Sequence, residues 1–231
     1  RCRRGSPRRR RSSRRASRIL VASRATLTAI GKRHRAKSHK MLENAVDLAR
    51  FQATPWPDPP IGRPLRVLFV GRLVPIKGVD LLLKAIAQVK SAGQSIRLDV
   101  IGDGPLRWEW HALAVRLNLA DQVFFHGALS QNEVAQHMSQ SHLFCLPSVR
   151  ESGGAVLLEA MASARPVVAL DFGGPGEIID DEVGALLEQA PRAQEGELVV
   201  GHEVLARRQR VLLDPDERLA EVEPASLSAG G

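Results

Sequence analysis

A chain of 231 residues with 44% apolar residues can bury one sizeable core, which favours a folded domain with appendages over a wholly disordered protein. Its formal net charge of +8 is unevenly distributed, because 16 of the 33 lysines and arginines fall in residues 1–40, which contain no acidic residue. The remaining residues have 17 basic and 25 acidic side chains, and the chain contains no tyrosine, so charge and stacking rings both argue against nucleic acid as a partner of the folded part.

The number of cysteines and the hydropathy of the chain indicate the cellular compartment of the protein. Cys2 and Cys145 are too few for a disulfide framework, which favours a reducing compartment, and Cys145 is expected to be a small core residue. No apolar stretch approaches the length of about 20 residues that spans a bilayer. We therefore expect a cytoplasmic protein, either free or associated with the inner face of the membrane.

The N-terminal part of the chain divides into a tail, a mixed segment and a linker. Residues 1–18 combine dense positive charge with no apolar periodicity, so we expect a disordered basic tail, either merely solvated or bound to an anionic membrane or RNA. Residues 19–64 are mixed, with helical character near 25–32. Five prolines in residues 53–64 forbid regular structure and predict a domain boundary there.

Between residues 65 and 188, short apolar runs alternate with helical patterns. Strands are expected at 65–70, 96–101, 122–126, 142–147 and 166–170, and helices at 79–92, 105–118, 131–140 and 155–164. Apolar strands joined by helices predict an α/β fold, a Rossmann-like parallel sheet with helices on both faces. Residues 189–231 are expected to form a loose tail with one helix near 203–213.

Several other polar residues are expected to have structural roles. Ser130 and Glu133 predict a capping box at the start of a helix. Asp103 lies in a glycine turn and is expected to cap the next helix rather than bind a ligand. The seven histidines are scattered along the chain, so no metal site is predicted.

A basic loop follows the first strand of the predicted domain. Gly71 and Arg72 come directly after the strand, and Lys77 precedes the next helix. Basic groups at the carboxyl end of a strand can hold a diphosphate, with the arginine in bidentate geometry and the lysine as a point charge. The alternative is a solvated basic turn.

Residues 151–159, a glycine turn followed by the first residues of a helix, also have the composition of a binding site. Glycines such as Gly153 and Gly154 let a ligand approach the backbone, and free N–H groups at the start of a helix attract an anion. Glu151 and Glu159 would repel a phosphate, which favours them as acceptors for the hydroxyl groups of a sugar or a ribose. The alternative is one carboxylate stabilised at a helix N-terminus and one solvated glutamate.

The E-x7-E spacing of Glu151 and Glu159 occurs together with Gly71-Arg72, Lys77-Gly78 and the turn Gly173-Gly174-Pro175 with Glu177. In this order the motifs resemble the nucleotide-sugar domain of the family 4 glycosyltransferases, which have the GT-B fold. The resemblance covers roughly residues 65–187 and implies a single C-terminal half of that fold. For Glu177 alone, a carboxylate at a helix N-terminus is an equal alternative.

The resemblance implies a retaining glycosyltransferase that moves a hexose from a nucleoside diphosphate sugar to a hydroxyl group of a saccharide or lipid-linked acceptor. It implies catalytic roles for Arg72 and Lys77 at the donor diphosphate and for Glu151 at the transferred sugar, and it places Glu159 at the nucleotide's ribose. The other residues implied at the donor site are Gly71, Ser152, Gly153 and Gly154. No cofactor and no metal are expected, because the two basic residues supply the positive charge.

Only about 50 residues precede the linker, whereas the acceptor domain of this family is comparable in size to the donor domain. The resemblance therefore implies that residues 19–64 are a remnant of an N-terminal domain that is otherwise missing, and that the donor half is inactive alone. A nucleotide-sugar-binding or regulatory protein without transferase activity is the alternative. A glycoside hydrolase is disfavoured, because its two carboxylates must flank a bond.

Overall fold

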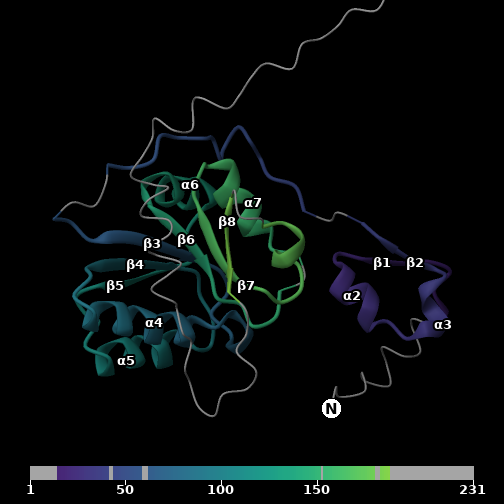
Figure 1. The fold of residues 1–231 in the computed structure, drawn as a ribbon, viewed down its shortest axis with the longest axis horizontal. Helices are drawn as coiled ribbons and strands as arrows, with labels where there is room; N and C mark the ends of the chain where they lie inside the picture. The colour runs from purple at the N-terminus through teal and green to yellow at the C-terminus, as the bar shows by residue number, and fades with distance from the viewer. Residues whose placement is uncertain (1–14, 42–43, 59–61, 152, 180–182, 188–231) are drawn as a thin grey trace, which may run out of the picture. The chain divides into compact units, whose positions relative to one another are not determined.

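The computed structural model describes residues 15–41, 44–58, 62–151, 153–179 and 183–187 (Figure 1). Most of the basic tail, the segment 189–231 and the helix expected near 203–213 lie outside the described residues. Within the described part, every helix falls short of the length and apolar character that crossing a membrane requires.

A six-stranded, fully parallel sheet forms the centre of the main domain. Its strands are β3 (Leu65–Val70), β4 (Ile96–Ile101), β5 (Val123–Gly127), β6 (Leu143–Leu146), β7 (Val167–Leu170) and β8 (Gly184–Leu187). Their spatial order is β5-β4-β3-β6-β7-β8. The chain therefore adds β4 and β5 on one side of β3, and then adds β6, β7 and β8 on the other side. The predicted α/β fold is confirmed, and β8 is an additional strand that the sequence pattern did not predict.

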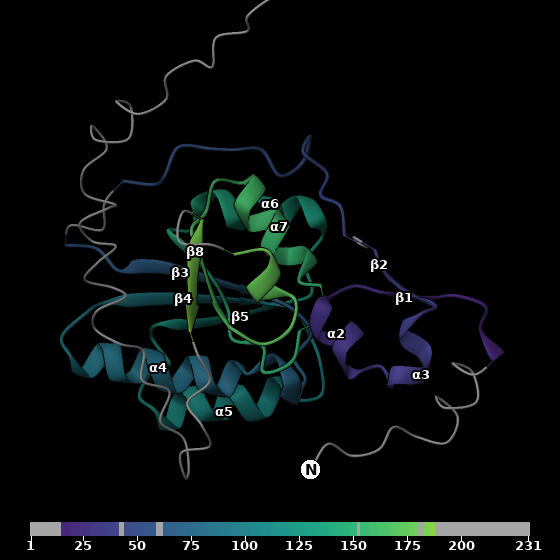
Figure 2. The ribbon, with the colours of Figure 1, turned by 45° about the vertical axis from the view of Figure 1, so that its right-hand side comes forward.

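Four helices cover the two faces of this sheet. They are α4 (Val79–Ser91), α5 (Arg107–Arg116), α6 (Gln131–Gln140) and α7 (Ala155–Ala162). Figures 1 and 2 both place α4 and α5 on one face and α6 and α7 on the other. Two short 3-10 turns, η1 (Pro75–Lys77) and η2 (Pro175–Glu177), follow β3 and β7. The layered arrangement is the one expected when parallel strands are joined by right-handed helical crossovers.

The helices begin and end where local chemistry dictates. The predicted capping box at α6 is confirmed, because Ser130 Oγ accepts from the Glu133 N–H while the Glu133 carboxylate accepts from the Ser130 N–H at 2.8 Å. Two helices end beside residues with positive φ, Asn118 after α5 and Ala164 after α7. A left-handed residue stops helical hydrogen bonding, so both helices are shorter than the sequence pattern predicted.

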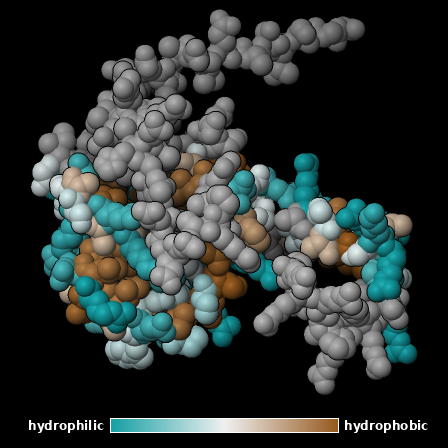
Figure 3. Space-filling model, turned by 60° about the horizontal axis from the view of Figure 1, so that its bottom comes forward, coloured by the Kyte–Doolittle hydropathy of each residue, from teal (hydrophilic) through white to brown (hydrophobic). Residues whose placement is uncertain are grey.

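The core lies on both sides of the central strands. Phe69 on β3, Phe144 on β6 and Leu98 on β4 have no exposed side-chain surface. Figure 3 shows apolar and hydrophilic residues interspersed over the face that it presents. The exposed large apolar side chains are Leu20, Met41, Leu48, Ile76, Trp108, Val115, Phe124 and Phe172. The strands therefore bury their apolar residues on both faces, as in other parallel sheets.

The N-terminal segment forms a small β-α-α-β unit. Strands β1 (Ile19–Val21) and β2 (Ser38–Lys40) pair in parallel, and the helices α2 (Arg24–Ala29) and α3 (Lys32–Arg35) connect them. The Ser23 hydroxyl caps α2 by accepting from the Thr26 N–H at 3.2 Å. The single helical region expected near 25–32 is thus two short helices, and both strands went unpredicted.

Residues 53–58 of the proline-rich linker lie against the main domain and lack regular structure, as predicted for this segment. Phe51 is buried in the core just ahead of the linker. The Trp56 indole N–H donates to the His142 carbonyl at 3.0 Å, and the two rings meet edge to face. His142 Nε2 in turn donates to the Asp58 carbonyl at 3.1 Å. The linker is therefore held by specific hydrogen bonds rather than only tethered at its ends.

Arg165 holds the same linker from inside the domain. Its side chain is only 2% exposed, and its guanidinium donates to the carbonyls of Ser163 at 2.9 Å and Ser141 at 3.1 Å. The Nη2 group donates to the Thr54 carbonyl, to the Thr54 hydroxyl at 2.9 Å and to the Pro55 carbonyl at 2.9 Å. Burial lowers the pKa of Arg165. Carbonyl and hydroxyl dipoles, rather than a carboxylate, are its hydrogen-bond acceptors in the described residues.

Candidate functional site

The order of the strands places the two candidate loops at the point where the sheet changes direction. Strands β3 and β6 are neighbours, but the chain continues from β3 toward one edge of the sheet and from β6 toward the other. In open α/β sheets, ligands bind in the crevice outside the carboxyl ends of the strands at such a switch point. The basic loop follows β3, and the loop with Glu151 follows β6. The two candidate loops therefore lie on the two sides of the switch point.

Lys77 and Glu151 form an ion pair between these loops. Lys77 Nζ donates to Glu151 Oε2 at 2.6 Å, although the two residues are 74 positions apart in the chain. The Lys77 side chain is 20% exposed and the Glu151 side chain 12% exposed, so bulk water screens the pair only in part. The structure thus brings together the two residues that the sequence analysis placed at the diphosphate and at the sugar.

Backbone contacts fix the position of Glu151. Its carbonyl accepts from the Gly174 N–H at 2.9 Å, and it forms an isolated parallel bridge with Gly173. Gly173 has a φ of 89°, and a Cβ at this position would lie 2.1 Å from the Glu151 carbonyl oxygen. Only glycine satisfies both the conformation and the close approach. The Gly173-Gly174 turn after β7 is therefore a support for the loop after β6.

The start of α7 also depends on a glycine. Gly154 is the N-cap residue, with φ 63° and ψ 45°, and no side chain caps the helix. Its neighbour Gly153 is buried. Helix N-termini without a capping side chain leave backbone N–H groups for an anion or polar ligand. Ser152, which the sequence analysis placed at the donor site, lies outside the described residues.

Arg72 and Glu159 differ from the paired residues because neither side chain has a hydrogen-bond partner within the described residues. Arg72 is exposed directly after Gly71 at the end of β3. Glu159 is half-buried, and burial raises its pKa, an effect that the charge of Arg50 partly offsets. Glu159 is the fifth of eight residues in α7, so it lies past the middle of the helix. Both groups can bind a ligand without breaking an existing contact.

Asp103 does not cap α5, in contrast to the prediction. The N-cap residue of α5 is Leu106, which makes no side-chain capping bond. Instead, Asp103 Oδ1 accepts from the Gly104 N–H at 2.7 Å, and the carboxylate lies 3.9 Å from Arg107. Asp103 lies three residues before the cap position, and its carboxylate stabilises the glycine turn in which it lies.

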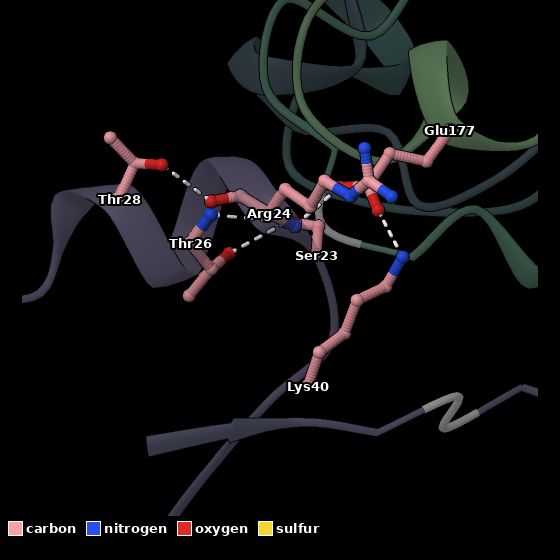
Figure 4. A network of polar contacts seen from close by, with 6 residues as sticks. All are labelled: Ser23, Arg24, Thr26, Thr28, Lys40 and Glu177. Carbon is pink, nitrogen blue, oxygen red and sulfur yellow. Dashed lines mark hydrogen bonds and ion pairs between the residues drawn. The ribbon is translucent and has the colours of Figure 1, made fainter. Parts of the chain in front are cut away.

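Glu177 contacts the N-terminal segment rather than the candidate loops. Its carboxylate pairs with Lys40 and accepts from the Arg24 N–H at the start of α2 (Figure 4). Burial raises the pKa of Glu177, but the bonds from Lys40 and Arg24 outweigh this, so the net pKa is lowered. Figure 4 also shows the Ser23 cap and the Thr28 hydroxyl, which donates to the Arg24 carbonyl at 2.9 Å. Glu177 is thus a helix N-terminal carboxylate for α2, a role that local sequence could not reveal.

Cys145 and two of the histidines complete the comparison with the sequence analysis. Cys145 lies in β6 against the core as expected, and burial raises the pKa of its thiol to about 12. His126 and His137, which are scattered in the sequence, lie with their ring centroids 4.7 Å apart. Asp99 accompanies them. Spacing along the chain gave no signal for this cluster, because it depends on strand register.

A doubly wound parallel sheet with charged groups at its switch point defines an α/β protein that binds ligands at the carboxyl ends of its strands. The chain belongs to the glycosyl transferases group 1 family, which it matches over residues 55–197. It is 34% identical over 177 residues to alpha-D-kanosaminyltransferase of Streptomyces kanamyceticus, an alignment that covers 73% of this chain and 44% of that protein. It is 31% identical over 192 residues to 2-deoxystreptamine glucosyltransferase of the same organism, covering 79% of this chain and 47% of that protein.

Solved structures agree with this family. Sucrose-phosphate synthase from Thermosynechococcus elongatus superposes with a TM-score of 0.70 and 26% identity, over 92% of this chain and 54% of that chain. Anabaena HepE in complex with UDP and glucose superposes with a TM-score of 0.68 and 24% identity, over 90% of this chain and 56% of that chain, which supports the fold. The chain spans about half the length of the curated relatives and structures that it matches.

Proposed function

We propose that this chain binds a nucleoside diphosphate sugar in the crevice outside the carboxyl ends of β3 and β6, as the donor half of a retaining glycosyltransferase. The observation that carries the proposal is the contact of Lys77 with Glu151 across the switch point of the sheet. Family membership supports it, since the same two residues belong to the motifs that resemble family 4 enzymes. The acceptor is a hydroxyl group of a saccharide or of a lipid-linked sugar.

Each candidate residue has a distinct role in this proposal. Arg72 and Lys77 bind the diphosphate and stabilise the negative charge that develops on the leaving nucleotide. Glu151 accepts hydrogen bonds from the transferred hexose, and Glu159 accepts them from the ribose. The glycine loops, with Gly71, Ser152, Gly153 and Gly154, admit the donor close to the backbone. This set supplies positive charge without a metal, so the proposed transfer uses none.

We further propose that the isolated chain transfers little sugar by itself. It spans about half the length of its relatives, and positioning an acceptor in line with the donor contributes on the order of 7–11 kcal/mol to such reactions. The setting that fits the two-cysteine composition is the cytoplasm, with the basic tail at an anionic membrane surface. The same half-length coverage favours a second function, a nucleotide-sugar-binding or regulatory protein that does not catalyse transfer.

Calorimetric titration of the full chain with UDP, GDP and ADP and their hexose conjugates tests donor binding. We expect saturable binding of one nucleotide class, weakened about 10–100-fold by Arg72→Ala, because a hydrogen bond to a charged group contributes about 1.5–3 kcal/mol. Arg116→Ala is the matched control, because Arg116 is an exposed arginine in the last turn of α5. A folded chain that binds none of these nucleotides at millimolar concentration would sink the proposal.

An experiment with the acceptor-binding half of a related enzyme distinguishes the two proposed functions. Full chain supplied with the acceptor-binding half of a related enzyme should transfer sugar if the donor half is catalytically competent. Donor binding without transfer in that mixture, with a working donor half of the relative as positive control, would favour the regulatory alternative.

A further inference from the structure

Three side chains with metal-binding atoms converge near β5, an edge strand of the sheet. None of them lies on β3 or β6, the strands that precede the candidate donor loops. Asp99 lies in β4, His126 in β5 and His137 in α6. One potential ligand atom from each lies within 4.8 Å of the other two. His126 Nε2 is 2.7 Å from Asp99 Oδ1, and the two imidazole rings are 4.7 Å apart between centroids.

The fold holds these groups together from three elements. Asp99 is the register partner of Phe124, and the β4–β5 register shifts between Val100 and Ile101, so His126 is an extra residue in β5. Its Nε2 atom lies 2.7 Å from Asp99 Oδ1, so both side chains lie on the same face of the sheet. Helix α6 covers this face, and His137 lies in its last turn. Figures 1 and 2 both show α6 on the face opposite α4 and α5. Two strands and a helix therefore hold the cluster, with His126 at an irregularity of the ladder.

The hydrogen bond between His126 and Asp99 lies within the cluster. His126 Nε2 is 2.7 Å from Asp99 Oδ1, so a proton joins these two atoms in the free chain. A metal ion bound to both atoms would take the place of this proton, because metal ligands must be deprotonated.

Arg97 competes for the same carboxylate but leaves room for a metal. Its Nε donates to Asp99 Oδ2 and its Nη2 to Asp99 Oδ1, both at 3.0 Å, and its guanidinium stacks over Phe124. A metal on Oδ1 displaces one of these bonds, while the bond to Oδ2 can remain and orient the carboxylate. The positive charge of Arg97, whose side chain is 42% exposed, limits the affinity rather than preventing binding.

We propose that Asp99, His126 and His137 form a binding site for a divalent transition-metal ion, for which zinc is the matching ion. Two imidazole nitrogens and one carboxylate oxygen, with water as the fourth ligand, are a set that zinc accepts in tetrahedral geometry. Magnesium and calcium prefer oxygen ligands throughout, so the histidines select against them. The bound ion fastens α6 to strands β4 and β5. It takes no part in the proposed sugar transfer, whose residues follow β3 and β6.

Zinc binding to the tag-free full chain tests the site. After treatment with a chelator and its removal, the chain is titrated with zinc chloride by calorimetry, and cobalt(II) is added separately to record its visible absorption bands. We expect a zinc-dependent rise in melting temperature and a cobalt spectrum typical of low coordination number. Replacing a ligand should weaken zinc binding at least tenfold, because even outer partners of metal ligands change affinity about 10–100-fold.

His126→Gln and His137→Gln are the test variants, and His111→Gln is the matched control. His111 lies on α5, where its ring contacts Phe125 rather than the cluster. We expect both test variants to lose the melting-temperature response and the cobalt bands, and the control to keep them. Each variant is first compared with the parent chain by circular dichroism without metal, which separates loss of the ligand from loss of the fold. Zinc binding that survives in both test variants, or no uptake by the folded parent chain, overturns the proposal.

Discussion

Lys77 is already neutralised by Glu151 in the free protein, so a diphosphate must compete with a carboxylate for it. Replacing Glu151 by Gln removes the competing charge and leaves Lys77 free for phosphate oxygens. We predict that Glu151→Gln binds a free nucleoside diphosphate severalfold more tightly than the parent chain. The same variant should lose the added affinity that the hexose provides, because a carboxylate acceptor is gone.

Titration calorimetry with a nucleoside diphosphate and its hexose conjugate measures both effects. Asp121→Asn is a matched control, because it alters an exposed partner of Lys90 at 3.5 Å, away from the switch point. Weaker binding of the free diphosphate by Glu151→Gln would show that Glu151 does not compete with the ligand for Lys77.

Glu159 links ligand binding to pH and to stability. Burial raises its pKa in the folded chain, so the folded state binds this proton more tightly than the unfolded state does. Its ionised form therefore costs stability at neutral pH, and this cost disappears as the pH falls through the raised pKa. We predict that Glu159→Gln increases the melting temperature at pH 7 and that the difference from the parent chain vanishes at low pH.

Glu159→Gln should lower the nucleotide affinity at pH 7, although it raises the melting temperature. If the ionised carboxylate accepts the ribose hydroxyls, affinity in the parent chain declines with acidification at a higher pH than an ordinary glutamate would cause. Glu159→Gln should bind more weakly at pH 7 and lose that acid dependence. Identical pH profiles in the two proteins would exclude Glu159 from the nucleotide site.

At the scale of elements, the linker and the main domain are joined through Arg165. Its removal would leave buried carbonyls of Ser141 and Ser163 without a donor and would release Thr54 and Pro55. We predict that Arg165→Met, which keeps most of the side-chain volume, lowers the free energy of unfolding by about 2–4 kcal/mol in urea titrations.

Arg116→Met serves as the control for Arg165→Met, because it changes an exposed arginine. Limited proteolysis should cut residues 52–58 faster in Arg165→Met than in the control. Equal stability of the two variants would mean that the linker contacts contribute little net energy.

The sequence predicted elements well where the signal was local. Strands β3 and β4 and helix α6 agree with their expected bounds, because apolar runs and a capping box mark them. Strand β8 was missed because its sequence, GALL, contains no β-branched or aromatic residue, and it becomes a strand by pairing with β7. The end of α7 was overestimated because its left-handed residue, Ala164, has no side chain typical of a helix end.

At the scale of the whole molecule, the coverage of only about half the length of the curated relatives that the chain matches leads to a kinetic expectation. We predict that the 231-residue chain, incubated with a nucleotide sugar that it binds, shows little or no multiple-turnover transfer to saccharide or lipid acceptors. Chromatography of radiolabelled products measures this. Robust turnover without an added partner would mean that residues 19–64 or 188–231 contribute an acceptor site.

The basic tail should be dispensable for folding. Residues 1–14, which lie outside the described structure, hold eight arginines, no acidic residue and no apolar pattern, so their deletion should leave the melting temperature nearly unchanged. Vesicles that contain anionic lipid should retain the parent chain and release it at high salt, at about 1 kcal/mol per basic residue near the surface. Retention that does not depend on ionic strength would contradict an electrostatic tail.

The candidate site was predictable in part. Charged residues and glycines at strand ends predicted Arg72, Lys77 and Glu151, because parallel strands bring such loops to one edge of the sheet. The cluster of Asp99 with His126 and His137 was not predictable, since the register of β4 and β5 and the packing of α6 decide it. Likewise, the burial of Arg165 depends on a linker more than 100 residues away along the chain.

The attachment of the linker determines where the chain can bend. Val46 and Phe51 pack against the main domain, and Thr54, Trp56 and Asp58 hydrogen-bond to it. Proline-rich connectors are usually regarded as spacers between moving parts, but these contacts lead us to expect that residues 46–58 move together with the main domain. We therefore expect the hinge for any closing motion to lie before Val46, and spin labels at Gln52 and Gln88 should keep a constant separation when nucleotide binds.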